Sequence, residues 1–358
     1  MPAMTSQASN RPRLVRVFLS PQRGLSLIEL MIAMAIGIFM SSGIISLMLS
    51  MSKNRTELDK TSEQIENGRY AIQQLSDEIR LAGFFGASQI VPTQISSPDP
   101  CASPATVSNF QFSYNASTQA ITMPVPIYGH AAGSTLPACL ASSITAGSET
   151  LTLRRVGTTD VAPSTLAGAN AAPYVQFSAC DSDVKPFVFS ATTTDFTLRK
   201  KNCSTAATVW PYLSHTFFLS NCDDCTVNDG IPTLKMWDQV TGAIQTVSEG
   251  IEDIHFAYGM DLDKNGSPDC YVADPSAATA PPAAGCPAGW GTPLQNWANV
   301  VTVRVHLLAR SIDATPAWND TFTYDLGRSS RSGPFNDRYK RQVYSAVIVV
   351  ANVSGGRE

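Results

Sequence analysis

The chain has 358 residues, a formal net charge of −4 and 15% charged residues. This acidic balance argues against general binding to nucleic acid, which requires a basic surface. No G-x-S-x-G, H-E-x-x-H or phosphate-loop pattern occurs and the four histidines are scattered, so the sequence does not predict an enzyme.

The first predicted element is a long apolar helix that follows a cationic leader. Residues Leu25–Met51 carry no formal charge except Glu29. As a helix this segment would be about 40 Å long, and about 20 apolar residues already span a bilayer. The leader, residues 1–24, contains four arginines and no acidic residue, and initiation at Met4 would shorten it. The positive flank of a membrane span stays in the cytoplasm, so we expect one crossing with the rest of the chain outside.

Glu29 is the unusual residue of this helix. An ionised carboxylate in hydrocarbon costs roughly 2.5–3.5 kcal/mol and therefore needs a partner. Cleavage after Gly24 would provide one, because the new α-amino group of Leu25, in this or a neighbouring copy, would lie at the same depth. An uncleaved signal anchor explains the span and its orientation, but neither Glu29 nor this junction. An ordinary secretory signal has a shorter apolar stretch and a small-residue cleavage site.

The segment Arg23–Leu30 resembles the class III signal of type IV pilins and type II secretion pseudopilins. The resemblance implies a prepilin peptidase that cuts after Gly24 and methylates Leu25, with Glu29 as the assembly carboxylate. It also implies a single-pass protein of the bacterial inner membrane, with its carboxyl terminus in the periplasm, that enters a filament. Loss of the leader with its four arginines would lower the net charge from −4 to about −8.

The helix is predicted to continue beyond the membrane. Apolar residues recur there every seven positions, with Leu75 and Ala82 on adjoining positions of the same stripe. The repeating residues are Leu58, Ile65, Ile72 and Ile79. Two glycines, Gly83 and Gly86, offer a stop. We therefore expect one helix over residues 25–82, spanning the membrane over 25–51, and a globular domain over 83–358 on which its second half lies.

All eight cysteines follow the membrane segment, as expected for disulfides in an oxidising compartment. Eight cysteines allow 105 pairings, and the pairing of sequence neighbours is one plausible choice among them. Those neighbours are Cys101 and Cys139, Cys180 and Cys203, Cys222 and Cys225, and Cys270 and Cys286. The Cys222-Asp-Asp-Cys225 motif also allows a zinc or redox interpretation, but zinc would need a second pair of ligands and the nearest histidine is His215.

Residues 83–358 read as short strands separated by loops. Alternating or apolar runs predict strands over 120–127, 149–156, 195–199, 216–219, 243–247 and 300–310. The run over 343–351 is more continuously apolar, as in a strand covered on both faces. Residues 272–297 are rich in Ala, Pro and Gly and predict a long surface loop, which Cys270–Cys286 would pin. The expected fold is α+β, a pilin-like long helix laid on an antiparallel sheet with long loops.

The segment from Asp261 to Asp269 begins like a calcium loop. Oxygen ligands two residues apart, followed by a turn glycine, can enclose a hard cation. The candidate ligands are Asp261, Asp263, Asn265, Ser267 through its carbonyl, and Asp269. The terminal glutamate of an EF-hand is replaced by Val272, and no flanking helices are evident. An Asx-rich turn without a metal is the alternative, so Ca²⁺ is the one cofactor to test.

Several segments resemble the PilW family of minor pilins: residues 80–84, 249–261, 307–311 and 338–344, but nothing over about 90–240. The resemblance implies a low-abundance subunit that helps to initiate and cap type IV pili. Its implied partners are other minor pilins, the major pilin and a tip-associated adhesin-like protein. The alternatives are a minor pseudopilin of type II secretion and a calcium-dependent adhesin module at the tip. The use of the pilus, in twitching motility, adhesion or DNA uptake, is left open.

Overall fold

The computed structural model describes residues 24, 26–86, 90–103, 106–140, 143–281 and 284–357. The chain divides into two compact units, which we call the amino-terminal unit, Met1–Thr56, and the carboxy-terminal unit, Glu57–Glu358. The predictions made for the leader and for Leu25 fall outside the described residues, apart from Gly24.

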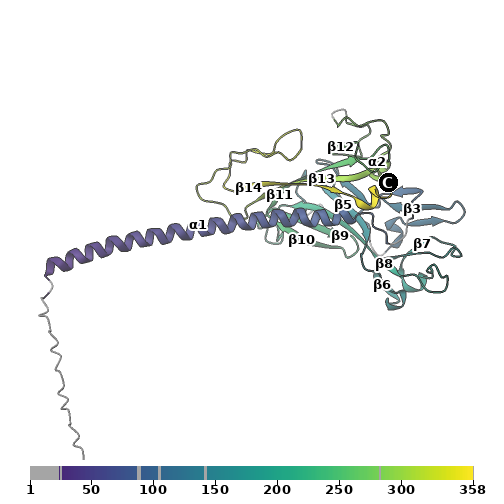
Figure 1. Cartoon of the computed structure of the whole chain (residues 1–358), viewed down its shortest axis with the longest axis horizontal. Coiled ribbons are helices and arrows are strands. Elements are labelled where there is room, and N and C mark those ends of the chain that lie inside the picture. Colours follow the sequence, from purple (N-terminus) through teal and green to yellow (C-terminus); the bar gives the residue numbers. More distant parts are fainter. Residues whose placement is uncertain are drawn as a thin grey trace, which may run out of the picture. The chain divides into compact units, whose positions relative to one another are not determined.

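The predicted long helix is present as α1, Leu27–Leu81 (Figure 1). No proline interrupts it, which agrees with its unbroken course. In the amino-terminal unit, every described side chain from Ser26 to Thr56 is exposed. Among the described residues, α1 alone is long and apolar enough to cross a membrane. So much exposed apolar surface is unfavourable in water, and the segment therefore needs lipid or neighbouring helices around it.

In the carboxy-terminal unit, α1 buries a face that overlaps the predicted stripe: Leu75, Ile79 and Ala82 are buried, and Ile72 packs partly buried against the same core. The buried residues of α1 are Gln64, Gly68, Ala71, Leu75, Ser76 and Ile79. Leu58, the first member of the predicted heptad series, is 69% exposed. The prediction followed the largest apolar residues, whereas small residues at Gly68 and Ala71 let the helix approach the sheet closely. The carboxy-terminal unit begins within α1, at Glu57, because the second half of the helix supplies part of the core of that unit.

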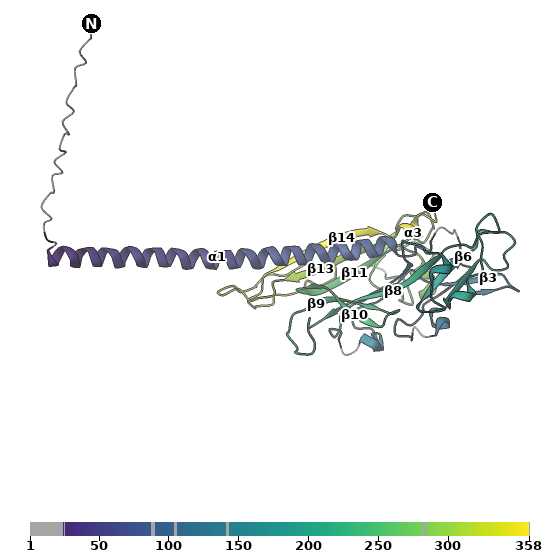
Figure 2. The same ribbon diagram turned by 90° about the horizontal axis from the view of Figure 1, so that it is seen from below.

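The helix packs on a four-stranded antiparallel sheet in the order β12-β11-β13-β14. These strands are β11, Ile251–Met260, β12, Cys270–Val272, β13, Val300–Arg310, and β14, Arg341–Val349. Figure 2 shows β11, β13 and β14 running side by side along α1. Val303, Val305 and Leu307 of β13 lie in one core with Leu75 and Ile79 of the helix. The predicted α+β arrangement of a helix on an antiparallel sheet is thus confirmed.

A second, seven-stranded sheet has the order β10-β9-β8-β5-β4. In the same sheet β6 pairs with β8, and β7 pairs with β6. Its strands are β4, Ile127–His130, β5, Thr150–Val156, β6, Ala169–Phe177, β7, Phe187–Thr192, β8, Val209–Ser220, β9, Thr233–Asp238, and β10, Ala243–Glu249. A small sheet contains β1, Gln94–Ser96, β2, Ser113–Asn115, and β3, Ala120–Pro124. The short helices are α2, Pro293–Ala298, and α3, Ala351–Ser354. An aromatic cluster that includes Phe110, Phe187 and Tyr212 forms a separate core under β6 and β7.

Three predictions about strands and loops were wrong in part. Residues 195–199 form no strand: a 3-10 turn covers Thr193–Asp195, and Arg199 makes a single bridge to Ala206. The strand over 343–351 is not covered on both faces, because Val347 is 57% and Val349 49% exposed; β14 is also the edge strand of its sheet. The expected loop over 272–297 holds most of α2 at its end.

Candidate functional site

Glu29 lies in the first turn of α1 with its side chain exposed. The helical hydrogen bonds begin just before it, since Leu30 N–H donates to the Ser26 carbonyl at 3.1 Å. A carboxylate at this end is favourable because the first-turn N–H groups are unpaired and carry partial positive charge. Gly24 is open, with no atom within 4 Å of an added Cβ. The predicted assembly carboxylate, Glu29, therefore lies exposed at the head of the apolar helix, close to the predicted cleavage point.

The segment that connects β13 to β14, residues 311–340, is held by buried ion pairs. Arg341 binds Asp320 at 2.8 Å and Asp337 at 2.6 Å, and the side chains of Arg341 and Asp320 are both fully buried. Burial by itself lowers the pKa of Arg341, but hydrogen bonds to Asp337 and Glu252 outweigh it and raise the pKa. The arginine therefore stays charged, and the segment folds back against the start of β14.

A second network joins this segment to both large sheets. Arg328 binds Asp253 of β11 at 2.6 Å and Glu149, next to β5, at 3.2 Å. Glu149 also accepts hydrogen bonds from Phe256 N–H and binds His255 Nδ1, each at 2.8 Å. Glu149 is buried, and its carboxylate is satisfied by three partners from two parts of the chain, β11 and the 311–340 connection. This cluster fixes the relative position of the two sheets within the carboxy-terminal unit.

At the start of the carboxy-terminal unit, Glu57 of α1 binds the same connecting segment. Its carboxylate lies 2.9 Å from Lys340 Nζ and accepts a hydrogen bond of 2.8 Å from Thr315. The hydrogen bonds from Lys340 and then Thr315 lower the pKa of Glu57. The 311–340 connection is thus tied to the helix as well as to both sheets.

The predicted calcium loop brings three of its carboxylates together. Oxygen atoms of Asp261, Asp263 and Asp269 all lie within 4.8 Å of one another, and Asp261 is buried. Arg357 already binds Asp261 at 2.9 Å. Burial raises the pKa of Asp261, but the hydrogen bond from Arg357 and the backbone N–H of Gly266 lower it overall. Both interpretations of the loop stay open, because these oxygens suit calcium and yet are arranged by internal hydrogen bonds.

The remaining predicted ligands complete an Asx-type turn. Asn265 donates its side-chain amide to Asp263 at 2.9 Å and accepts a hydrogen bond from Ser267 N–H at 2.8 Å. Asp269 accepts hydrogen bonds from Leu262 N–H and Asp263 N–H. Calcium binding stays a prediction.

The eight cysteines form four disulfides, and no described cysteine is free. The pairs are Cys101–Cys139, Cys180–Cys203, Cys222–Cys225 and Cys270–Cys286. This is the pairing of sequence neighbours. Cys222 and Cys225 are bonded to each other and are therefore not zinc ligands here.

Sequence reasoning missed the buried charge clusters around Arg328 and Arg341. Neither arginine belongs to a recognisable motif, and their partners lie 4 to 179 positions away along the chain. The available signal was weak: an arginine at the first position of an apolar run, as at Arg341, is expensive to bury without a partner. Nothing in the sequence identified Asp320 or Glu252 as that partner.

Two family models match the chain. Residues 19–50 match the prokaryotic N-terminal methylation motif, and residues 216–352 match the family described as Type IV Pilus-assembly protein W. The first match contains Gly24 and Glu29. The second contains β9 to β14, so it covers the four-stranded sheet under α1. It also contains the Arg341 cluster and all of the Arg328 cluster except Glu149. No curated protein and no solved structure is significantly similar to the chain. The prepilin-type motif at the amino terminus and the match over the carboxy-terminal sheet together support a PilW-like protein of the type IV pilin class.

Proposed function

We propose that this protein is a minor pilin that helps to initiate assembly of type IV pili and then caps the filament. The observation that supports the proposal most directly is the exposed apolar part of α1 with one carboxylate, Glu29, at its head. The match of residues 216–352 to a pilus-assembly family supports a pilus rather than a type II secretion filament.

In this proposal the prepilin peptidase removes residues 1–24 and leaves Leu25 as the amino terminus. The apolar helix then passes from lipid into a bundle of like helices, which exchanges one apolar environment for another and costs little. Glu29 pairs there with the α-amino group of a neighbouring subunit. Removing one partner of a buried ion pair costs about 3–5 kcal/mol, so the pair favours a single axial register between subunits.

The large carboxy-terminal unit supports a place at the tip. A subunit inside a filament has neighbours on both sides along the axis, whereas the terminal subunit has none beyond it. A unit as large as Glu57–Glu358 is accommodated most easily where one side is free. We propose that its partners are other minor pilins, the major pilin and a tip-associated adhesin-like protein.

The test replaces Glu29 by Gln, which removes the charge and keeps the size. The variant is expressed from a plasmid in cells that lack the chromosomal copy. We expect at least a tenfold drop in surface filaments counted by electron microscopy and loss of this chain from purified minor-pilin complexes. The matched control is Glu66→Gln, an exposed glutamate of the same helix, which should behave as wild type. Normal piliation with Glu29→Gln would refute the proposed role.

Cleavage is tested separately by amino-terminal sequencing of the protein extracted from membranes. The expected first residue is methylated Leu25. Deletion of the chain should abolish twitching and leave type II secretion unchanged. The reverse pattern would favour the pseudopilin alternative.

A further inference from the structure

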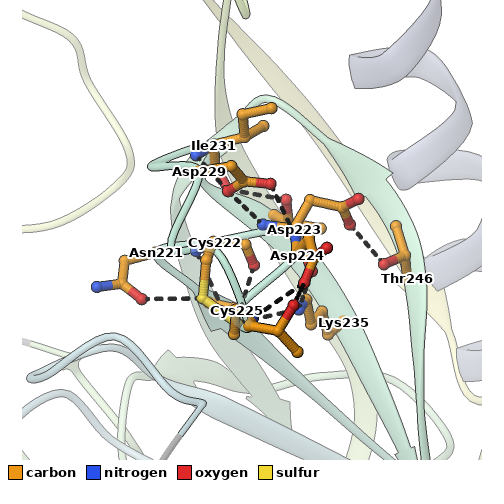
Figure 3. The surroundings of a disulfide bond; sticks show 12 residues. Asn221, Cys222, Asp223, Asp224, Cys225, Asp229, Ile231, Lys235 and Thr246 are labelled. Carbon is orange, nitrogen blue, oxygen red and sulfur yellow. Dashed lines mark hydrogen bonds between the residues drawn. A yellow bond between two sulfur atoms is a disulfide. The ribbon is translucent and has the colours of Figure 1, made fainter.

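We propose that Cys222–Cys225 is a thiol–disulfide exchange site, which a dithiol reductant opens while the other three disulfides stay closed. It lies in the loop between β8 and β9 (Figure 3). Cys225 is exposed and Cys222 is buried, so one sulfur is open to attack.

The sulfur of Cys225 has a buried cation beside it. Lys235 of β9 is 6% exposed, and its Nζ lies 3.4 Å from Cys225 Sγ. The same ammonium donates to the Asp223 carbonyl at 2.7 Å. None of the ion pairs found among the described residues includes Lys235. The backbone N–H of Ile231 lowers the pKa of the Asp229 carboxyl most and the charge of Lys235 helps to lower it, but that carboxylate does not contact the ammonium. A thiolate at Cys225 would place a negative charge in direct contact with it.

One hydroxyl group lies within hydrogen-bond distance of both sulfur atoms. Ser220 Oγ, at the end of β8, lies 3.4 Å from Cys222 Sγ and 3.4 Å from Cys225 Sγ. It can donate a hydrogen bond to whichever sulfur carries charge. The carboxylates of the same loop oppose a thiolate, but the charged group in contact with sulfur is Lys235, and Coulomb energy falls with distance.

The exchange proceeds in two balanced steps. A thiolate of the reductant attacks Cys225 Sγ, forms a mixed disulfide with it and breaks the Cys222–Cys225 bond, and the electron pair goes to Cys222 Sγ, which then takes a proton. The second thiol of the reductant loses its proton and attacks its own sulfur in the mixed disulfide. This closes the reductant's disulfide and releases Cys225 as a thiolate beside Lys235. The reductant loses two electrons and the protein disulfide gains two.

The loop does not depend on this disulfide for its shape. Asp229 accepts the backbone N–H groups of Asp223, Asp224 and Ile231 at 2.8–3.0 Å. Thr246 of β10 donates to the Asp223 carboxylate at 2.6 Å. The two cysteines of this disulfide are separated by 3 positions in the sequence, whereas the cysteines of the other three are separated by 38, 23 and 16. Cys222–Cys225 therefore restricts the unfolded chain least. Opening it therefore leaves the loop anchored and the change reversible.

The test is a redox titration of the full-length chain in detergent micelles with oxidised and reduced dithiothreitol. Free thiols are alkylated at each ratio, and peptide mass spectrometry gives the reduced fraction of each pair. We expect Cys222–Cys225 to open first. Lys235→Met should require about a tenfold higher ratio of reduced to oxidised reagent, a midpoint about 30 mV more negative, while Lys235→Arg should stay near wild type.

The matched control is Lys201→Met, an exposed lysine near Cys180–Cys203, which should not move the midpoint of Cys222–Cys225. If Lys235→Met does not fold, two other results test the proposal. Cys222–Cys225 should still open first in wild type, and Ser220→Ala should make its midpoint more negative by a smaller amount than expected for Lys235→Met. The proposal fails if Cys222–Cys225 opens last, or if Lys235→Met folds and leaves its midpoint unchanged.

Discussion

At the scale of single residues, the charged groups inside the carboxy-terminal unit are the most informative. Glu78 of α1 binds Arg155 of β5 at 2.7 Å and His215 of β8 at 3.1 Å. Its side chain is 19% exposed. Burial raises the pKa of Glu78, but hydrogen bonds from His215 and Arg155 outweigh it and lower the pKa to about 2. This one carboxylate therefore links the helix to the seven-stranded sheet.

The depressed pKa predicts how stability depends on pH. A carboxyl group that titrates at 4.5 unfolded and at about 2 folded stabilises the protein above pH 4.5 and loses this contribution as pH falls toward 2. The shift corresponds to on the order of 3 kcal/mol at neutral pH. Glu78→Gln should therefore destabilise the protein at pH 7 and match wild type near pH 2. Urea unfolding across this range measures it, with the exposed Asp77→Asn as a control that should track wild type.

The calcium prediction depends on Arg357, which already neutralises Asp261. If the loop binds calcium, millimolar calcium should raise the melting temperature of wild type, and Asp263→Asn should remove the rise. Arg357→Met should lower the melting temperature without calcium and enlarge the rise with it, because Asp261 then lacks its cation. The exposed Asp313→Asn should change nothing. If the melting temperature of wild type is the same with and without calcium, the loop is an Asx-rich turn that does not bind the metal.

The residues proposed for processing and assembly belong to one short contiguous motif, which a family model also matches. Gly24 and Glu29 need only their neighbours in sequence to be recognised. The contacts of Glu78, Arg328 and Arg341 were not predictable in the same way. Each joins segments far apart in the chain, and burial is decided by a fold that no local pattern specifies.

At the scale of elements, the contact between α1 and β14 is set by a missing side chain. A Cβ added at Gly68 would lie 2.3 Å from the ring of Tyr344. The helix can approach the strand because residue 68 is glycine, although glycine in a helix interior costs about 1 kcal/mol relative to alanine.

Gly68→Ala should therefore destabilise the carboxy-terminal unit by about 1–3 kcal/mol, despite the better helix propensity of alanine. In a double-mutant cycle, Tyr344→Ala should remove most of this penalty, because the clash is with its ring. Chemical denaturation of the four proteins measures the coupling. Additive effects would mean that the ring moves aside at no cost.

Strands with clear alternation or long apolar runs were located well, including β5, β13 and β14. The environment of β14 was not predicted well, because the apolar run over 343–351 does not reveal that one face of the strand is exposed. The buried face of α1 was predicted only in part, for a related reason. A heptad of large residues is visible in sequence, whereas the close approach permitted by Gly68 and Ala71 depends on the sheet beneath.

At the scale of the whole molecule, the division at Thr56 and Glu57 predicts how the chain can be cut. A fragment of residues 57–358 retains Leu75 and Ile79 in its core and should be soluble and monomeric, with all four disulfides. A fragment of residues 83–358 lacks these side chains and should be unfolded or aggregated. Size-exclusion chromatography and near-ultraviolet circular dichroism distinguish the outcomes. A folded 83–358 fragment would show that the helix is dispensable for the core.

Arg357 binds the Asp261 carbonyl and carboxylate, and it also donates to the Ala298 carbonyl at 2.6 Å. It leaves the ribosome 96 residues after Asp261. During synthesis the turn at 261–269 therefore emerges without its guanidinium partner, and this corner of the protein can close only after translation has passed residue 357. A nonsense mutation shortly before residue 357 would give a product that lacks this closure, and proteases would have an accessible loop to cut.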